Sequence, residues 1–150
     1  MIITKFAKMT EEAVIPKYAK PGDAGMDIYA LTGQVIPGNA RGFLVKTGLK
    51  VWLPEGYELQ IRPRSGMSAK TAIRIANTPG TVDEGYTGEI CVICDNFSNQ
   101  DFVIDADNRR IAQAVIKEVP KIEVQEISIE EMEQRITERG DNGFGSTGRH

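Results

Sequence analysis

The residues best suited to chemistry in this sequence lie near its C-terminus. Residues 139–148 read RGDNGFGSTG and contain four glycines, one aromatic ring, one arginine and two hydroxyls. Glycine weakens regular structure, so this segment cannot serve a packed core. Its backbone N–H groups and hydroxyls can bind phosphate oxygens, Arg139 can pair with phosphate charge, and Phe144 can stack on a base. The composition therefore predicts a nucleotide-binding segment that becomes ordered only over its substrate.

The general base is expected to be a residue other than histidine. The chain contains a single histidine, His150, at its last position. This position argues against a Ser-His-Asp or Cys-His catalytic pair. A carboxylate, a lysine or a tyrosine is therefore expected to carry out any proton transfer.

Two cysteines, Cys91 and Cys94, have the C-x-x-C spacing of redox pairs and of half a zinc site. The surrounding residues 89–94 are rich in β-branched side chains and predict a strand, on which positions three apart point to opposite faces. The sequence holds no second pair of cysteines or histidines to complete four zinc ligands. We therefore expect both cysteines to be ordinary strand residues.

The composition is that of an ordinary globular domain, with 26% charged and 41% hydrophobic residues in a chain of 150. The net charge of −3 gives no electrostatic reason to bind long nucleic acid, so any cation-rich site must be local. No apolar run approaches the roughly 18 residues that span a membrane. Residues 1–5 lack the apolar stretch of a signal peptide. We expect one cytoplasmic domain, residues 1–150, with no membrane or nucleic-acid partner.

The elements that position these residues are predicted to be short strands. Turn signals recur roughly every 8–12 residues, which is typical of an all-β barrel or sandwich. The predicted strands are 33–35, 43–45, 49–53, 57–61, 89–94, 101–104 and 112–119. A short helical turn is predicted within 65–76. A second is predicted at 128–132, where Ser128 and Glu131 have the spacing of a capping box.

Glycine and charged residues also cluster at four places before the C-terminal segment. These clusters are Ala24-Gly25-Met26-Asp27, Arg62-Pro63-Arg64-Ser65-Gly66, residues 80–89 (GTVDEGYTGE) and Arg110-Ile111-Ala112-Gln113. Each cluster alone is common turn or surface sequence. Taken in order with residues 139–148, they resemble the five motifs of the trimeric dUTP diphosphatases (dUTPases). The resemblance runs from residue 24 to residue 148.

The resemblance implies a jelly-roll-like β fold of the β-clip type, three identical subunits and three active sites at subunit boundaries. It implies Mg²⁺-dependent hydrolysis of dUTP to dUMP and pyrophosphate, which keeps uracil out of DNA and supplies dUMP for thymidylate synthesis. It also implies that residues 139–150 form a mobile lid that closes over a site. This agrees with a glycine-rich segment that is unsuited to the core.

The resemblance also assigns roles to single residues. Asp83 matches the aspartate that orients and deprotonates the attacking water, and Arg139 matches a catalytic cation. Asp27 matches a carboxylate that holds waters of the Mg²⁺ shell. Tyr86 matches the ring that excludes a 2′-hydroxyl. Phosphate binding falls to Arg64, Ser65, Gly66, Gln113, Ser146, Thr147 and Gly148. Uracil and deoxyribose binding falls to Asn77, Gly80, Val82, Tyr86, Gly88, Phe144 and Gly145.

Arg110 departs from the family pattern in its surroundings. A glycine and an acidic residue usually precede this arginine, whereas Asn108 and Arg109 stand there in this chain. Asparagine tolerates a left-handed turn, so we expect the backbone to be kept. We also expect the ion pair of the missing acid to be lost, which leaves the role of Arg110 open.

Two other functions are compatible with the sequence. A dCTP deaminase shares the fold, but it needs a carboxylate and a water at the base rather than at the phosphate. The spacing of Asp83 and Tyr86 and the complete fifth motif favour the diphosphatase. A nucleotide-sensing interaction protein on the same fold would use the dUTP site as a switch.

Overall fold

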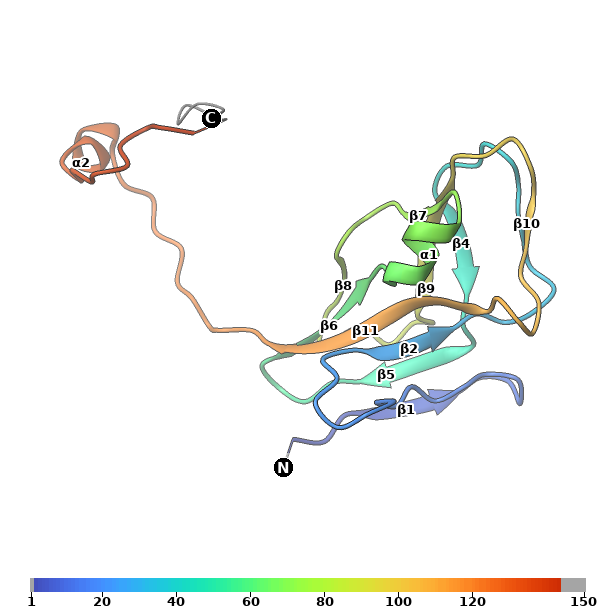
Figure 1. The fold of residues 1–150 in the computed structure, drawn as a ribbon. Coiled ribbons are helices and arrows are strands. Elements are labelled where there is room, and N and C mark those ends of the chain that lie inside the picture. The colour runs from blue at the N-terminus through green and yellow to red at the C-terminus, as the bar shows by residue number, and fades with distance from the viewer. Residues whose placement is uncertain (1, 144–150) are drawn as a thin grey trace. The chain divides into compact units, whose positions relative to one another are not determined.

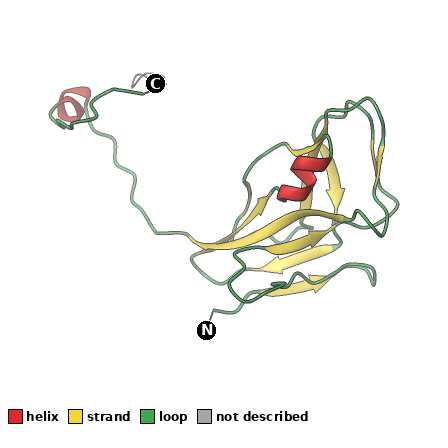
Figure 2. Cartoon of the chain, viewed as in Figure 1, coloured by secondary structure: helices red, strands yellow, loops and turns green. Residues whose placement is uncertain are grey.

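The strands form four antiparallel sheets in the computed structural model, which describes residues 2–143 (Figure 1). The chain divides into two compact units, Met1–Pro120 and Lys121–His150. The first unit contains every described strand and the helix α1 (Figure 2). The second unit contains the helix α2.

The largest sheet carries the predicted site residues Asp27 and Gln113. Its strand order is β2 (Met26–Tyr29), β11 (Arg110–Glu118), β6 (Tyr57–Arg62) and β8 (Gly80–Val82). A second sheet consists of β4 (Phe43–Lys46), β9 (Cys91–Asn96) and β7 (Ile73–Ile75). The two remaining pairs are β1 (Lys5–Lys8) with β5 (Leu49–Trp52), and β10 (Phe102–Val103) with β3 (Val35–Ile36).

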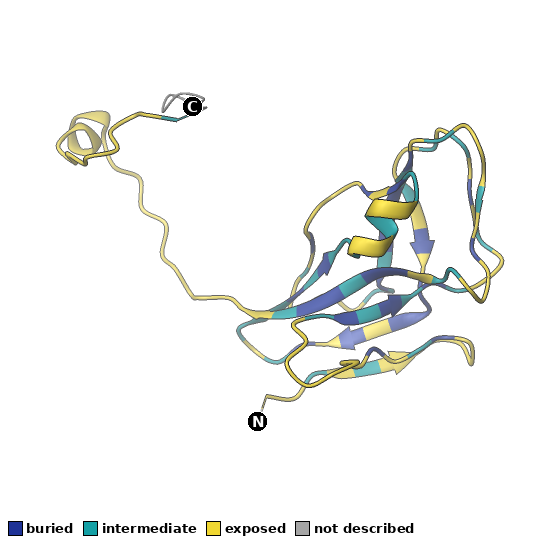
Figure 3. Ribbon diagram, in the orientation of Figure 1, coloured by how far each residue is buried: buried dark blue, intermediate teal, exposed yellow. Residues whose placement is uncertain are grey.

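A hydrophobic cluster between the strands forms the core of the first unit (Figure 3). Ile28, Ile36, Leu59 and Val92, each from a different strand, are fully buried within it. Burial alternates along β6 and β9, as the side-chain period of a strand requires. Each buried aliphatic side chain contributes roughly 1.5–3 kcal/mol, so the alternation fixes which face of each strand points inward.

The strand register decides which site residues share a face of the largest sheet. Asp27 lies opposite Gln113, and Gln113 lies opposite Arg62. Adjacent residues of a strand point to opposite faces, so the neighbouring row points the other way. That row is buried and consists of Met26, Ala114, Ile61 and Gly80.

Both predicted helical segments are present. α1 (Ser65–Lys70) ends at Lys70, and the extended backbone of its C-cap residue Thr71 leads toward β7. α2 (Ile129–Glu133) begins after Ser128, whose hydroxyl accepts the Glu131 N–H at 3.1 Å. The predicted capping position is therefore used as an N-cap. Within residues 2–143, no helix is long and apolar enough to cross a membrane.

The predicted all-β fold is confirmed, and each of the seven predicted strands overlaps an observed one. The prediction omits β1, β2, β7 and β8. Of these, β2 and β8 belong to the first and third motifs. Both strands are short and contain glycines or charged residues, which are not typical of strands. In β2, for example, burial alternates over only four residues: Met26 and Ile28 are buried, while Asp27 and Tyr29 are half-buried.

In the second unit, residues 121–128 are exposed and contain no strand. Ile122 and Val124 are 78% and 87% exposed. Side chains of this type are normally found inside proteins, so this segment has apolar surface that its own unit does not cover.

Candidate active site

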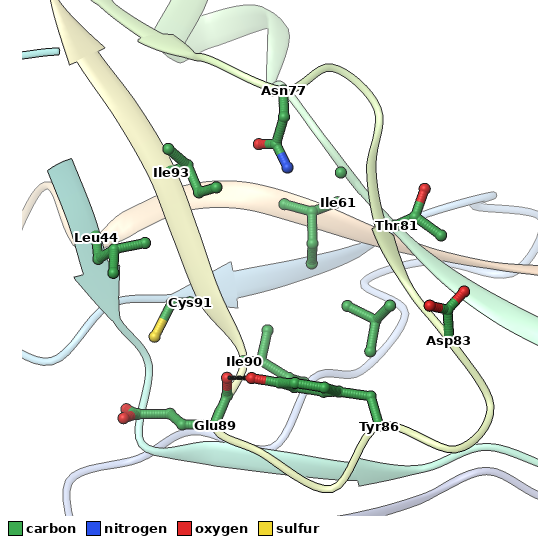
Figure 4. A pocket seen from close by; sticks show the side chains of 12 residues that line it. Leu44, Ile61, Asn77, Thr81, Asp83, Tyr86, Glu89, Ile90, Cys91 and Ile93 are labelled. Atoms are coloured by element: carbon green, nitrogen blue, oxygen red, sulfur yellow. Dashed lines mark hydrogen bonds between the residues drawn. The ribbon is translucent and has the colours of Figure 1, made fainter. Parts of the chain in front are cut away.

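Two pockets of the first unit collect most of the described site residues. The first, called the hairpin pocket below, has a volume of ≈ 270 Å³ and lies along β8 and the turn that follows it (Figure 4). Five of the predicted residues line it: Asn77, Gly80, Val82, Asp83 and Tyr86. The rest of its wall is formed by Leu44, Ile61, Thr81, Glu89, Ile90, Cys91 and Ile93.

The ring of Tyr86 lies across one end of the hairpin pocket (Figure 4). Its hydroxyl donates a 2.9 Å hydrogen bond to the carbonyl oxygen of Glu89. Gly88 makes this position possible, because a Cβ at residue 88 would overlap the hydroxyl end of the ring. Gly88, which the resemblance assigns to uracil and deoxyribose binding, therefore also makes room for the tyrosine.

Asp83 follows the last residue of β8 and lines the same pocket. Its carbonyl oxygen accepts the N–H of Tyr86 at 3.0 Å, which closes a four-residue turn. The turn places the carboxylate and the ring on the wall of a single pocket. The Asp83 side chain is exposed, so its carboxylate is accessible to water.

Asn77 lies at the end of the hairpin pocket away from Tyr86 (Figure 4). Gly80 stands between Asn77 and the core. A Cβ at residue 80 would come within 3.2 Å of the Ile61 Cβ and within 3.3 Å of the Asn77 Nδ2. Because no side chain projects there, the backbone of β8 forms part of the pocket wall.

The second pocket, called the polar pocket below, has a volume of ≈ 320 Å³. It brings together residues of the first, second and fourth motifs. Its lining consists of Ala19, Asp23, Ala24, Gly25, Asp27, Arg64, Ser65, Gly66 and Gln113. Except for Arg139, which belongs to the second unit, all the described residues predicted to bind phosphate or the Mg²⁺ waters are in this set.

Two arginines bind the carboxylate of Asp27. Arg64 donates from Nε to Oδ1 at 2.8 Å, and Arg110 donates from Nη1 to Oδ2 at 3.5 Å. Arg64 also donates from Nη1 to the carbonyl oxygen of Arg110 at 2.8 Å. These bonds fix the direction of the Arg64 guanidinium, which carries further N–H donors on Nη2. The structure thus gives Arg110, whose role the sequence leaves open, a contact with Asp27.

Gln113 is held beside this network by its neighbours. Its Nε2 donates to the carbonyl oxygen of Pro63 at 2.9 Å. A Cβ at Gly25 would overlap the Gln113 Oε1, so the glycine of the first motif leaves room for the glutamine of the fourth.

The structure contradicts the expectation that Asn108 adopts a left-handed backbone conformation. Among residues 2–143, Asn39 is the only non-glycine residue with a positive φ. The side chain of Asn108 shapes the turn instead, because its Oδ1 accepts the Asp105 N–H at 2.9 Å and its Nδ2 donates to the Val103 carbonyl at 2.7 Å. Side-chain hydrogen bonds of this kind replace a glycine turn without a positive φ.

Arg109, in the position of the usual acid, has partners of its own. Its guanidinium donates to the carbonyl oxygens of Ala30 at 3.0 Å and Glu12 at 3.1 Å, and it lies 3.6 Å from the Glu12 carboxylate. It also lies over the ring of Tyr29, 5.9 Å from its centre. Arg109 therefore joins the N-terminal segment to β2.

The two pockets share no lining residue. Asp27 and Gln113 belong to the row that points toward the polar pocket. Ile61 and Gly80, which line the hairpin pocket, belong to the buried row that points the other way. Within one chain, the described residues predicted to bind base and sugar therefore line one pocket, and those predicted to bind the α- and β-phosphates line another.

The remaining predicted site residues belong to the second unit or lie beyond the described part of the chain. Arg139 is exposed, and its Nε donates to the carbonyl oxygen of Asn142 at 3.2 Å. Phe144, Gly145, Ser146, Thr147 and Gly148 lie outside the described residues.

The sequence does not predict the apolar wall of the hairpin pocket. Leu44 of β4 and Ile93 of β9 are directly paired across their sheet, and Cys91 lies two residues before Ile93 on the same face. The alternation of β9 separates these partly exposed residues from the buried ones. The alternation predicts that one face of β9 is partly exposed, but no spacing in the sequence predicts that this face lies in the same pocket as Asp83.

Both cysteines are strand residues with free thiols, as the sequence predicts. Burial raises the pKa of the Cys91 thiol above its usual value, and the nearby Glu89 carboxylate adds to this. Burial, with a smaller effect of Asp95, raises the pKa of Cys94 to about 12. Neither thiol is therefore poised as a nucleophile at neutral pH.

Known proteins similar to this chain share both its sequence and its fold. The dUTPase family model matches residues 11–148. The deoxyuridine 5'-triphosphate nucleotidohydrolase of Fusobacterium nucleatum subsp. nucleatum is 48% identical over 93% of this chain and 93% of that protein. The protein of the same name from Alkaliphilus metalliredigens is 44% identical over 99% of each chain. The Staphylococcus bacteriophage 80alpha dUTPase, solved with dUPNHPP, matches at a TM-score of 0.80 and 26% identity, covering 98% of this chain and 99% of that one.

The β fold and these matches together define a nucleotide hydrolase of the jelly-roll type. The family match covers almost the whole chain. The chain belongs to the dUTPase family.

Proposed function

We propose that this dUTPase hydrolyses dUTP to dUMP and pyrophosphate by attack of water on the α-phosphorus, with Asp83 as the general base. The observation that carries the proposal is that Asp83 and Tyr86 stand on one turn in the wall of one pocket. Asp83 accepts the water proton as the new P–O bond forms, and pyrophosphate leaves with the electrons of the broken P–O bond. A positioned base of this kind contributes about 10²–10⁴-fold to the rate.

Uracil is recognised in the hairpin pocket. The strand β8 is at the edge of its sheet, so one side of its backbone is not used by the sheet ladder. Backbone N–H and C=O groups have a fixed order, and this order can distinguish the carbonyls and N–H of uracil from the amino group of cytosine. Asn77 at the end of the pocket adds a side-chain donor and acceptor.

Deoxyribose packs on Tyr86. The ring is held by its bond to the Glu89 carbonyl and by contact with Gly88, so it cannot move aside easily. A ribose hydroxyl directed at this ring would lose its hydrogen bonds to water without gaining a partner. The rigid ring therefore selects dUTP over UTP.

The polar pocket binds the triphosphate. Arg64 offers guanidinium donors, Ser65 a hydroxyl and Gly66 a backbone N–H, and Gln113 lies next to them. The donor set also fits a hydrated Mg²⁺ ion: Asp23 and Asp27 both line the pocket, and carboxylates accept hydrogen bonds from metal-bound water. Among the described residues, no group of three or more possible ligands could hold the ion directly. When bound with the triphosphate, Mg²⁺ neutralises phosphate charge, while Asp27 orients the waters around it.

The active site is assembled from several copies of the chain. The proposal rests on the two pockets, which share no lining residue and so divide the predicted nucleotide contacts between two places on one chain. The exposed Ile122 and Val124 support it, because association would bury them. The number of three copies rests on the resemblance to trimeric dUTPases. Arg139 and residues 144–148 then complete a site as a closing segment that binds phosphates and stacks Phe144 on uracil.

Hydrolysis in water enriched in ¹⁸O tests this function most directly. The proposal predicts that dUTP with Mg²⁺ yields dUMP and pyrophosphate, with the label in the phosphate of dUMP. Label in pyrophosphate would place the attack at the β-phosphorus and contradict it. Ammonia release from dCTP would instead support the deaminase alternative.

A further inference from the structure

The loop from Asp83 to Glu89 carries both proposed catalytic-site groups of the hairpin pocket, and both of its ends are tied to turns elsewhere in the fold. At the far end, the Glu89 Oε1 accepts the N–H of Gly48 at 2.8 Å. The Glu89 carbonyl accepts the Tyr86 hydroxyl at 2.9 Å. The tyrosine end of the loop is therefore fixed by two hydrogen bonds that meet at one residue.

The Asp83 end is tied by the side chain of Glu84. Its Oε2 accepts the N–H of Gly56 at 2.8 Å, across 28 positions of the sequence. The donor is itself well held. Gly56 has a φ of +78°, which favours glycine, and its carbonyl accepts the N–H of Val119 at 2.8 Å. The N–H of Gly56 thus offers a fixed point at the end of β11.

Glu84 is the second residue of the turn that Asp83 and Tyr86 close with their 3.0 Å backbone bond. Connecting segments on the surface are more mobile than the elements they connect. A hydrogen bond from the Glu84 side chain to a fixed donor restricts that motion. Glu84 is the sequence neighbour of Asp83, the proposed general base. The hydrogen bond of Glu84 to Gly56 therefore acts on the direction of the Asp83 carboxylate.

We propose that Glu84 is a positioning residue, which holds the Asp83 carboxylate toward the substrate by accepting the Gly56 N–H. This inference rests on the proposed role of Asp83 as the base. Misplacement of a reacting group by about 1 Å can cost up to 10²-fold in rate. Glu84 does not line the hairpin pocket, in which uracil is proposed to bind. Loss of its hydrogen bond to Gly56 therefore lowers turnover more than substrate binding.

Two variants separate the hydrogen bond from the charge of Glu84. Glu84→Gln and Glu84→Ala both remove the negative charge next to Asp83, but only glutamine keeps an oxygen that can accept the Gly56 N–H. We expect Glu84→Ala to lower the single-turnover rate about tenfold, with KM for dUTP changed less than about twofold. We expect Glu84→Gln to keep the rate within about twofold of the unchanged protein.

Several outcomes would overturn the proposal. An equal loss in both variants would assign the effect to charge, and a rise in KM at unchanged rate would assign it to substrate binding. An unchanged single-turnover rate in Glu84→Ala would show that the hydrogen bond between Glu84 and Gly56 has no role in catalysis. Glu11→Ala serves as the matched control, because it removes an exposed glutamate that lines neither pocket. The thermal unfolding midpoint of each variant shows whether a lost rate reflects a lost fold.

An Asp83→Asn background distinguishes this proposal from the proposed function. If Glu84 acts through Asp83, then adding Glu84→Ala to Asp83→Asn lowers the rate no further. A full additional loss would show that Glu84 acts by another route. If Asp83→Asn alone retains a normal rate, then the general-base assignment fails, whatever Glu84 does.

Discussion

Arg64 donates from Nε to the Oδ1 of Asp27 at 2.8 Å, so the proposed phosphate-binding arginine and the proposed Mg²⁺-water carboxylate are a bonded pair. The side chains are 25% and 28% exposed, so both can still reach solvent or a ligand. The proposed roles therefore predict that binding of the triphosphate and binding of its metal ion are coupled through this contact.

Asp27→Asn tests this coupling. The amide keeps an oxygen for Arg64 but loses the charge that attracts metal-bound waters. We expect the Mg²⁺ concentration for half-maximal hydrolysis to rise about 10–100-fold, as for other residues that act through metal-bound ligands. A titration of initial rate against Mg²⁺ measures it. An unchanged half-saturation would remove Asp27 from the metal site.

Tyr86→Ala and Gly88→Ala are expected to relax the choice of sugar. The first removes the ring, and the second forces the ring away because a Cβ would overlap it. We expect the ratio of kcat/KM for dUTP to that for UTP to fall at least about tenfold in both. Tyr86→Phe is the control, since it keeps the ring and loses only the bond to Glu89. Undiminished rejection of UTP by the alanine variants would contradict the sugar-packing role.

The sequence predicts part of the candidate site. Except for Asn77, the predicted site residues that line the two pockets belong to the motifs, each of which is continuous in the chain. Which of these residues share a face of the largest sheet does not follow from the motifs, because it depends on the register of Gln113 against Asp27 and Arg62. A shift of that register by one residue would turn the side chains to the other face, and no local sequence pattern predicts the register.

The strand β7 shows a second limit. Ile73–Ile75 lies inside the region predicted to contain a helical turn, and α1 ends at Lys70. A strand of three residues is too short for a periodic signal. It forms because Ile73 and Ile75 pack into the core while β7 pairs with β9, a contact distant in sequence.

The thiols give a pH-dependent test of the hairpin pocket. The raised pKa values predict that at pH 8 a disulfide reagent modifies Cys91 slowly and Cys94 only after unfolding. A dUTP analogue should slow the Cys91 reaction, because Cys91 lines the pocket. Cys91→Ser should abolish the slow phase. Reaction of Cys94 before Cys91 would contradict the burial on which this rests.

The Cys94 shift also predicts alkaline destabilisation. The folded state keeps the thiol protonated up to about pH 12, whereas the unfolded thiol ionises near 9.0. The stabilisation from this group is therefore complete below the unfolded pKa and is lost as the pH rises from there through the folded pKa.

Removal of residues 139–150 is expected to separate stability from activity. The described hydrogen bonds of Arg139, Gly140 and Asn142 stay within their own unit, so the first unit should keep its unfolding midpoint. We expect turnover to fall about 10²-fold, because phosphate charge loses donors that act in the transition state. Circular dichroism and initial rates measure the two effects. A truncated chain with full activity would contradict the lid.

The central claim is that Asp83 of one copy acts on a triphosphate held by Arg64 of another. Asp83→Asn and Arg64→Ala chains, each nearly inactive alone, test it when they are unfolded together and refolded as a mixture. Sites that combine an intact hairpin pocket from one variant with an intact polar pocket from the other should form, restoring up to about a quarter of the original activity. A mixture as inactive as its two parents would contradict the shared site.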